Sequence, residues 1–158
     1  MNLIIFGPPG AGKGTQSKYI ANKYNLYQLS TGELLRNEIK NKTELGSKIS
    51  SIINSGELVS DEIVSNLIEK FISNNNYKNK IIFDGYPRTL SQAKNLDNLL
   101  NKYKQKIDIV LKLSVNLETV KKRILERQTQ ENRADDNEEI AIKRYRTYEK
   151  SSEPVINY

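Results

Sequence analysis

One glycine-rich segment restricts the possible folds of this chain more than any other feature. The sequence GPPGAGK at 7–13 stands between a short apolar run at 1–6 and a helix-like stretch at 13–24. A buried strand that turns through glycines into a helix is typical of a parallel α/β fold. We therefore expect an α/β protein whose parallel sheet is covered by helices on both faces. Apolar patterns predict further strands at 80–84 and 107–113, and helices at 31–40, 45–53, 61–72, 89–101, 116–127 and 135 to about 148.

The same segment has the spacing G-x-x-x-x-G-K of a phosphate-binding loop. In such a loop, successive backbone N–H groups converge on an anion at a helix N-terminus, and Lys13 would add a positive charge. One position departs from the general pattern, because Gly14 stands where Ser or Thr usually ligates magnesium, and the first hydroxyl belongs to Thr15. A chance glycine-rich turn is the alternative, but the strand before it and the helix after it favour the phosphate loop.

Composition excludes several kinds of chemistry. The 158 residues suit one domain and include no cysteine and no histidine, so disulfides, thiolate zinc sites and Ser-His-Asp triads are ruled out. The net charge is +6, yet arginine occurs only at 36, 88, 123, 127, 133, 144 and 146. A guanidinium grips phosphate in two-point contacts that lysine cannot reproduce, so these arginines are candidate phosphate ligands. The apolar runs are too short for a signal peptide or a membrane span.

Two motifs together resemble a known family. The sequence GPPGAGKGTQ at 7–16 and the sequence DGYPR at 84–88 are similar to those of nucleoside monophosphate kinases, most closely adenylate kinases, and the resemblance extends over 1–158. It implies a P-loop NTPase-like three-layer sandwich with a parallel sheet. The core would be 1–29, 60–127 and 134–158, with a helical monophosphate-binding insert at 30–59 and a short lid at 128–133. The family continues with a strand and a terminal helix, which this chain lacks, and strand 107–113 would then have an open edge.

The resemblance implies the reversible reaction ATP + AMP = 2 ADP, by direct in-line phosphoryl transfer. Magnesium would accompany ATP and be held by Asp84, through water; a turn-forming aspartate before Gly85 is the alternative. No zinc is expected, because the short lid lacks the zinc-binding insert of some relatives. The implied ATP-binding residues are Gly10, Ala11, Gly12, Lys13, Gly14, Thr15, Arg123 and Arg127. The implied catalytic residues are Lys13, Arg88, Arg123, Arg127, Arg133 and Arg144.

The second substrate would lie against the insert. The implied AMP-binding residues are Thr31, Arg36, Glu57, Leu58, Val59, Gly85, Arg88, Gln92, Arg133 and Arg144. Thr31 and Gln92 favour adenine as the acceptor base, because a glutamine amide offers one donor and one acceptor. For Gln92 the alternative is structural, since Thr89 and Gln92 have the spacing of a helix capping box. Arg146 receives no role.

Other functions remain open at this point. A UMP/CMP kinase shares the short lid, and a truncated chain could bind nucleotides without turning them over. The net charge also allows a nucleic-acid binder, although the lysines are dispersed and basic and aromatic residues do not alternate. We expect a cytoplasmic monomer that uses ATP and AMP as small-molecule partners, with no nucleic acid and no membrane.

Overall fold

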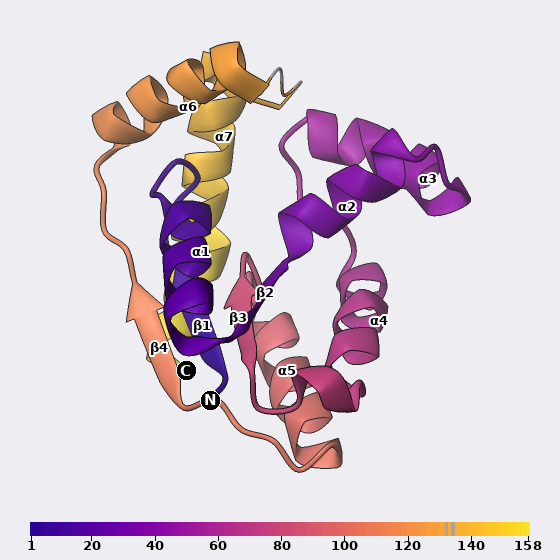
Figure 1. Ribbon diagram of the computed structural model, residues 1–158. Helices are drawn as coiled ribbons and strands as arrows, with labels where there is room; N and C mark the ends of the chain where they lie inside the picture. The colour runs from indigo at the N-terminus through magenta and orange to yellow at the C-terminus, as the bar shows by residue number, and fades with distance from the viewer. Residues whose placement is uncertain (132, 134) are drawn as a thin grey trace.

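The sheet is parallel throughout. The computed structural model describes residues 1–131, 133 and 135–158, and within them the sheet has the strand order β2-β3-β1-β4 (Figure 1). The strands are β1 (Leu3–Phe6), β2 (Tyr27–Ser30), β3 (Ile81–Asp84) and β4 (Ile109–Lys112). Leu3 of β1 is in register with Ile82 of β3 on one side and with Ile109 of β4 on the other. The predicted α/β class with a parallel sheet is therefore confirmed.

Apolar residues of β1 serve two cores, one on each face of the sheet. Leu3 and Ile5 pack with Ile20 of α1 (Lys13–Tyr24) on one face. Ile4 and Phe6 belong to the larger core on the opposite face. That core also contains buried residues of α4 (Asp61–Ile72) and α5 (Leu90–Lys102). Alternation along a strand buried on both sides produces this three-layer arrangement.

Two helices extend to one side of the sheet. α2 (Thr31–Lys40) and α3 (Glu44–Asn54) lie together at the right in Figure 1, beyond the end of β2. Side-chain caps begin both helices, since the hydroxyl oxygens of Ser30 and Thr43 accept backbone N–H groups of their first turns. At Gly46, α3 passes so close to α2 that a Cβ atom there would overlap the backbone of Glu38.

The last two helices meet at the top of the view, where α6 (Leu117–Glu131) lies across the molecule and from which α7 (Glu138–Thr147) runs downward (Figure 1). They share a small core of Val120, Ile124 and Ala141. A π-helical turn, Tyr148–Ser152, and a 3-10 turn, Glu153–Asn157, follow. None of the described helices is long and apolar enough to cross a membrane.

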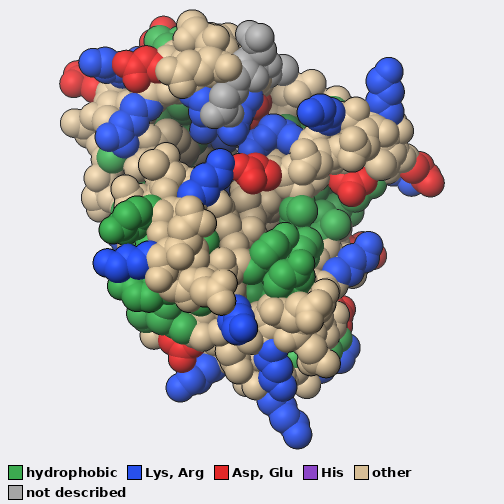
Figure 2. Space-filling view, in the orientation of Figure 1, with side chains coloured by type: hydrophobic (Ala, Val, Ile, Leu, Met, Phe, Trp, Pro, Cys, Tyr) green, Lys and Arg blue, Asp and Glu red, His purple; other side chains and the backbone are tan. Residues whose placement is uncertain are grey.

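β4 lies at the edge of the sheet, as the sequence predicts for strand 107–113. Its side chains are exposed, with Val110 50% accessible. Figure 2 shows hydrophobic side chains at the surface on this left side of the molecule.

Two predictions of secondary structure need correction. The sequence at 27–30, YQLS, gives no apolar run, yet it forms β2, because pairing with β3 supplies its backbone hydrogen bonds. The predicted helix at 116–127 is too short at its C-terminal end, since α6 continues to Glu131. Polar residues such as glutamine are good helix formers when exposed, so polarity alone does not end a helix. Residue 132 of the predicted lid and residue 134 of the predicted core lie outside the described residues.

Candidate active site

A cavity forms where β1 and β3 end, as expected for ligand sites in open parallel sheets. It gathers residues from the phosphate loop, from α2, from the segment before α4 and from α7. Predicted site residues that line it are Lys13, Thr31, Arg36, Glu57, Leu58, Val59, Gly85, Arg88, Gln92 and Arg144. Gly10, Ala11, Gly12, Gly14, Thr15, Arg123, Arg127 and Arg133 are described but are not among its lining residues. In Figure 2, Lys and Arg side chains gather in the same upper region, between α6 and α2.

The phosphate loop has the backbone that its glycines permit. Gly10 and Gly12 adopt positive φ angles of 73° and 92°, which L-residues with side chains rarely adopt. A Cβ on Gly10 would also lie 3.3 Å from the Val120 carbonyl oxygen of α6. The Lys13 ammonium donates hydrogen bonds to the carbonyl oxygens of Gly7 at 2.7 Å and Pro8 at 2.8 Å. The Lys13 side chain is therefore folded back onto its own loop, whose backbone N–H groups would bind the same phosphates as the lysine.

Electrostatics around Lys13 disfavour its charged form. Burial lowers the pKa of Lys13 to about 7, with Asp84 acting to raise it and the nearby guanidinium groups of Arg88, Arg144 and Arg127 acting to lower it. An anion bound among these groups would reverse the effect, because opposite charge favours the ammonium.

Arg36 and Arg88 form a positive pair on the α2 side of the cavity. Burial lowers the pKa of Arg88 to about 10, and the charges of Arg144 and Arg36 contribute. The Arg88 Nε–H donates to the Gly85 carbonyl at 2.7 Å, and a Cβ on Gly85 would come 2.9 Å from the Arg88 guanidinium. Among the ion pairs found between described residues, neither arginine has a carboxylate partner. Such a pair is suited to a dianionic phosphate.

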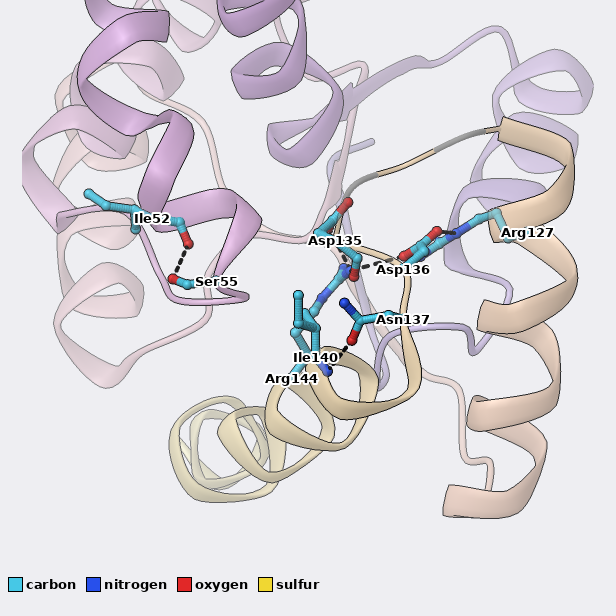
Figure 3. A network of polar contacts seen from close by, with 8 residues as sticks. All are labelled: Ile52, Ser55, Arg127, Asp135, Asp136, Asn137, Ile140 and Arg144. Atoms are coloured by element: carbon cyan, nitrogen blue, oxygen red, sulfur yellow. Dashed lines mark hydrogen bonds and ion pairs between the residues drawn. The ribbon is translucent and has the colours of Figure 1, made fainter.

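Two further arginines are held by neighbouring aspartates (Figure 3). Arg127 makes a two-point contact with Asp136, with Nε and Nη2 each 2.6 Å from a carboxylate oxygen. The Arg144 Nη1 atom lies 2.7 Å from Asp135 and 3.3 Å from Asp136. Asp136 is fully buried. Asn137 caps α7 directly afterwards, through Ile140 N–H. The loop therefore fixes both guanidinium groups from α6 and α7.

Sequence reasoning missed these two aspartates as functional residues. The signal was an adjacent acidic pair, Asp135 and Asp136, following Arg133 in a region otherwise rich in arginine. Charge alternation of this kind is usually a solvated surface. Both aspartates are buried, however, so they do not belong to a solvated surface. Arg123, from the same helix as Arg127, instead donates to the Gly10 carbonyl at 3.3 Å and so contacts the phosphate loop.

Asp84 is buried at the end of β3. Its Oδ2 atom accepts a hydrogen bond of 2.9 Å from the Gln28 amide, a second contact that sequence reasoning missed because β2 was not predicted. A Cβ on Gly14 would lie 3.8 Å from the same oxygen. The glycine that departs from the general loop pattern therefore faces the carboxylate.

Thr31 and Gln92 lie in the cavity wall and are both buried. The Thr31 hydroxyl donates to the Gly85 carbonyl at 2.9 Å. Thr89 caps α5 by accepting the Gln92 N–H at 3.1 Å, but the Gln92 side chain does not complete a capping box. Its Oε1 accepts the Arg88 N–H at 2.7 Å, and its Nε2 donates to Asp61 at 2.7 Å.

The chain is similar to known proteins over nearly all of its length. The family model described as adenylate kinase matches residues 5–158. This chain belongs to the adenylate kinase family. All of the chain aligns with the adenylate kinase of Pelagibacter ubique at 45% identity, covering 86% of that protein. It aligns equally completely with those of Caulobacter vibrioides, at 44% identity and 83% coverage, and Archaeoglobus fulgidus, at 40% identity and 85% coverage. The resemblance drawn from the two motifs is confirmed.

Proposed function

We propose that this adenylate kinase family member catalyses ATP + AMP = 2 ADP by direct transfer between two phosphate sites. The observation that carries the proposal is the convergence of Lys13, on the phosphate loop, with Arg36 and Arg88 in one cavity. A single phosphate site would serve a nucleotide binder or a hydrolase. Two adjacent sites suit a transfer between phosphates, in which positioning and charge neutralisation supply most of the catalysis. The relatives are named adenylate kinases, which favours AMP over UMP or CMP.

Each group has a distinct task in this scheme. The loop amides, Lys13 and Arg123 hold the phosphates of ATP. Arg36 and Arg88 hold the phosphate of AMP. The attacking oxygen belongs to a phosphate whose second pKa is about 6, so it is ionised at neutral pH and needs no general base. A chain without histidine is therefore equipped for the reaction.

The arginines near the end of α6 and on α7 complete the site. Arg127 and Arg144 would neutralise charge on the transferring group, together with Arg133. Asp135 and Asp136 act as positioning residues, because their ion pairs fix the guanidinium groups before substrates bind. A preset geometry lowers the reorganisation needed at the moment of transfer. Under this proposal 30–59 forms the AMP-binding insert and 128–133 the lid over the donor.

The residues around Asp84 fit a magnesium ion that arrives with ATP. The carboxylate is buried beside the loop, and Gly14 leaves space next to its Oδ2 atom. Among the described residues no cluster of three or more Asp, Glu, His or Cys could hold a metal by itself. Magnesium commonly binds through one carboxylate, substrate phosphates and water. When bound, it would neutralise phosphate charge, and Asp84 would hold it through water.

ATP binding is expected to take up close to one proton at pH 8. The pKa of unliganded Lys13 is about 7, so the side chain is mostly neutral at pH 8, whereas bound phosphates raise that pKa and restore the ammonium. Affinity for MgATP should therefore fall as the pH rises above about 7. Calorimetric titrations in buffers of different ionisation enthalpy measure the proton number. Lys13→Met should bring it near zero, and absence of uptake by the native chain would contradict this prediction.

The proposed function is tested by measuring ADP formation from MgATP with AMP, UMP or CMP as the acceptor. AMP should give the highest kcat/KM. A preference for UMP or CMP would show that the chain acts as a UMP/CMP kinase and not as an adenylate kinase. A folded chain that binds ATP but turns over none of the three acceptors would be an inactive nucleotide binder.

A further inference from the structure

The buried side-chain amide of Gln92 is hydrogen-bonded to a residue that does not line the cavity. Asp61, the first residue of α4, accepts the Gln92 Nε2–H at 2.7 Å through Oδ1. The other carboxylate oxygen, Oδ2, accepts from the Thr89 hydroxyl at 3.3 Å. Asp61 does not line the cavity, whereas Gln92 does. Gln92 is only 3% exposed, so little of its surface is open to water that could compete for these partners.

The partners of Gln92 determine which end of its amide is oxygen and which is nitrogen. A carboxylate only accepts hydrogen bonds, so the atom facing Asp61 must be the NH₂ group. The backbone N–H of Arg88 only donates, so the atom facing it, at 2.7 Å, must be the carbonyl oxygen. Both constraints select the same orientation. Turning the amide over would set two donors against each other at Arg88 and two acceptors against each other at Asp61.

The fixed amide retains one hydrogen and one lone pair for a ligand in the cavity. A 6-aminopurine presents a donor at its 6-amino group and an acceptor at N1, which match the Gln92 oxygen and nitrogen. A 6-oxopurine presents the reverse, an acceptor at O6 and a donor at N1–H. It could pair with Gln92 only if the amide turned over.

We propose that Asp61 is a positioning residue that gives this enzyme its preference for 6-aminopurine over 6-oxopurine monophosphates. It acts through Gln92, without touching substrate, by holding the amide in the orientation that suits adenine. The inference rests on the proposed function, in which AMP occupies the cavity. The charge-assisted hydrogen bond to Asp61 is the stronger of the two constraints on the orientation of the amide. The hydrogen bond from the Arg88 N–H is the weaker one.

A purely structural role for Asp61 makes a different prediction. An acidic residue in the first turn stabilises a helix through the helix dipole. Glu62, the next residue, lies in the same first turn, is exposed and has no hydrogen bond to Gln92 among those found between described residues. If Asp61 served only α4, its loss would weaken AMP and IMP binding alike. Selectivity between the two ligands is therefore the decisive quantity.

The test is the ratio of the dissociation constants of IMP and AMP, measured by calorimetry on the full chain. IMP differs from AMP by the 6-oxo group and the N1 proton. We expect Asp61→Ala to lower the ratio by about tenfold and Glu62→Ala to leave it unchanged. In a Gln92→Leu background, Asp61→Ala should have no further effect on the ratio, because the amide that it orients is gone. Thermal unfolding of each variant confirms that it is folded.

The possible failures are distinguishable. A native chain that prefers AMP, with a ratio that survives Asp61→Ala, would overturn the role of Asp61 and leave the proposed function intact. A native chain that binds AMP and IMP equally would show that the oriented amide does not select the base, which also overturns the inference. A native chain that does not bind AMP would contradict the proposed function itself.

Discussion

Replacing Arg88 with alanine should lower kcat/KM for AMP by about a thousandfold, the scale on which single arginines act in phosphoryl transfer. The guanidinium lies next to Arg36 and Arg144, and burial together with these charges lowers its pKa to about 10. A bound phosphate relieves this repulsion, so the arginine contributes most when AMP is present. Affinity for MgATP should change little. Stability should not fall, because the variant removes a crowded positive charge.

The matched comparison is Arg146→Ala, which removes an exposed arginine from α7. It should leave kcat/KM for AMP unchanged. Arg88→Lys keeps the charge but loses the planar fork, so its activity should lie between those of the native chain and Arg88→Ala. Steady-state kinetics with varied AMP, alongside calorimetric MgATP titration, separates the two sites. Equal activity of Arg88→Ala and the native chain would exclude Arg88 from the AMP site.

Gly46→Ala should lower the free energy of unfolding by about 2–3 kcal/mol, as overpacking at a buried site does. In an exposed helix the same change is stabilising, because alanine is the better helix former. Here the added methyl group would overlap the carbonyl group of Glu38 and the backbone nitrogen of Ile39. The two helices must then move apart. Since α2 carries Thr31 and Arg36, KM for AMP should rise more than KM for ATP.

Ser47→Ala is the control, since Ser47 is the next residue of α3 and is exposed. It should leave stability within about 0.5 kcal/mol of the native value. Urea-induced unfolding followed by circular dichroism measures both variants. A Gly46→Ala protein as stable as the native chain would show that α2 and α3 do not pack as closely as the contact at Gly46 indicates.

Local pattern was sufficient for most of the fold. The helices predicted at 13–24, 31–40 and 61–72 have the observed bounds. For 31–40 and 61–72 the apolar spacing matches the faces that they bury, whereas helix 13–24 buries only Ser17 and was located by the phosphate loop that precedes it. β2 was not predicted because a strand of mixed polarity depends on its partner β3, which is distant in sequence. The end of α6 was placed too early because exposed glutamine is as compatible with a helix as with a loop.

The site also contains residues that the sequence locates and residues that it does not. The phosphate loop could be located from sequence because its glycines and its lysine are contiguous, and the AMP side because DGYPR at 84–88 is a compact signature. The residues that support these groups could not be located from the sequence. Asp61 lies 31 positions from Gln92, and Gln28 lies 56 positions from Asp84. Nothing local in the sequence connects them. Asp136 resembles a surface aspartate until its burial beneath Arg127 is known.

The two phosphate sites are expected to exchange one phosphoryl group directly. The transfer can be followed with ATP labelled in its γ-phosphate, with unlabelled AMP and the full chain. The label should appear in the β-phosphate of ADP, with two ADP molecules formed for each ATP consumed and almost no labelled inorganic phosphate. Label released as inorganic phosphate, or ATP consumed without ADP formed from AMP, would contradict direct transfer.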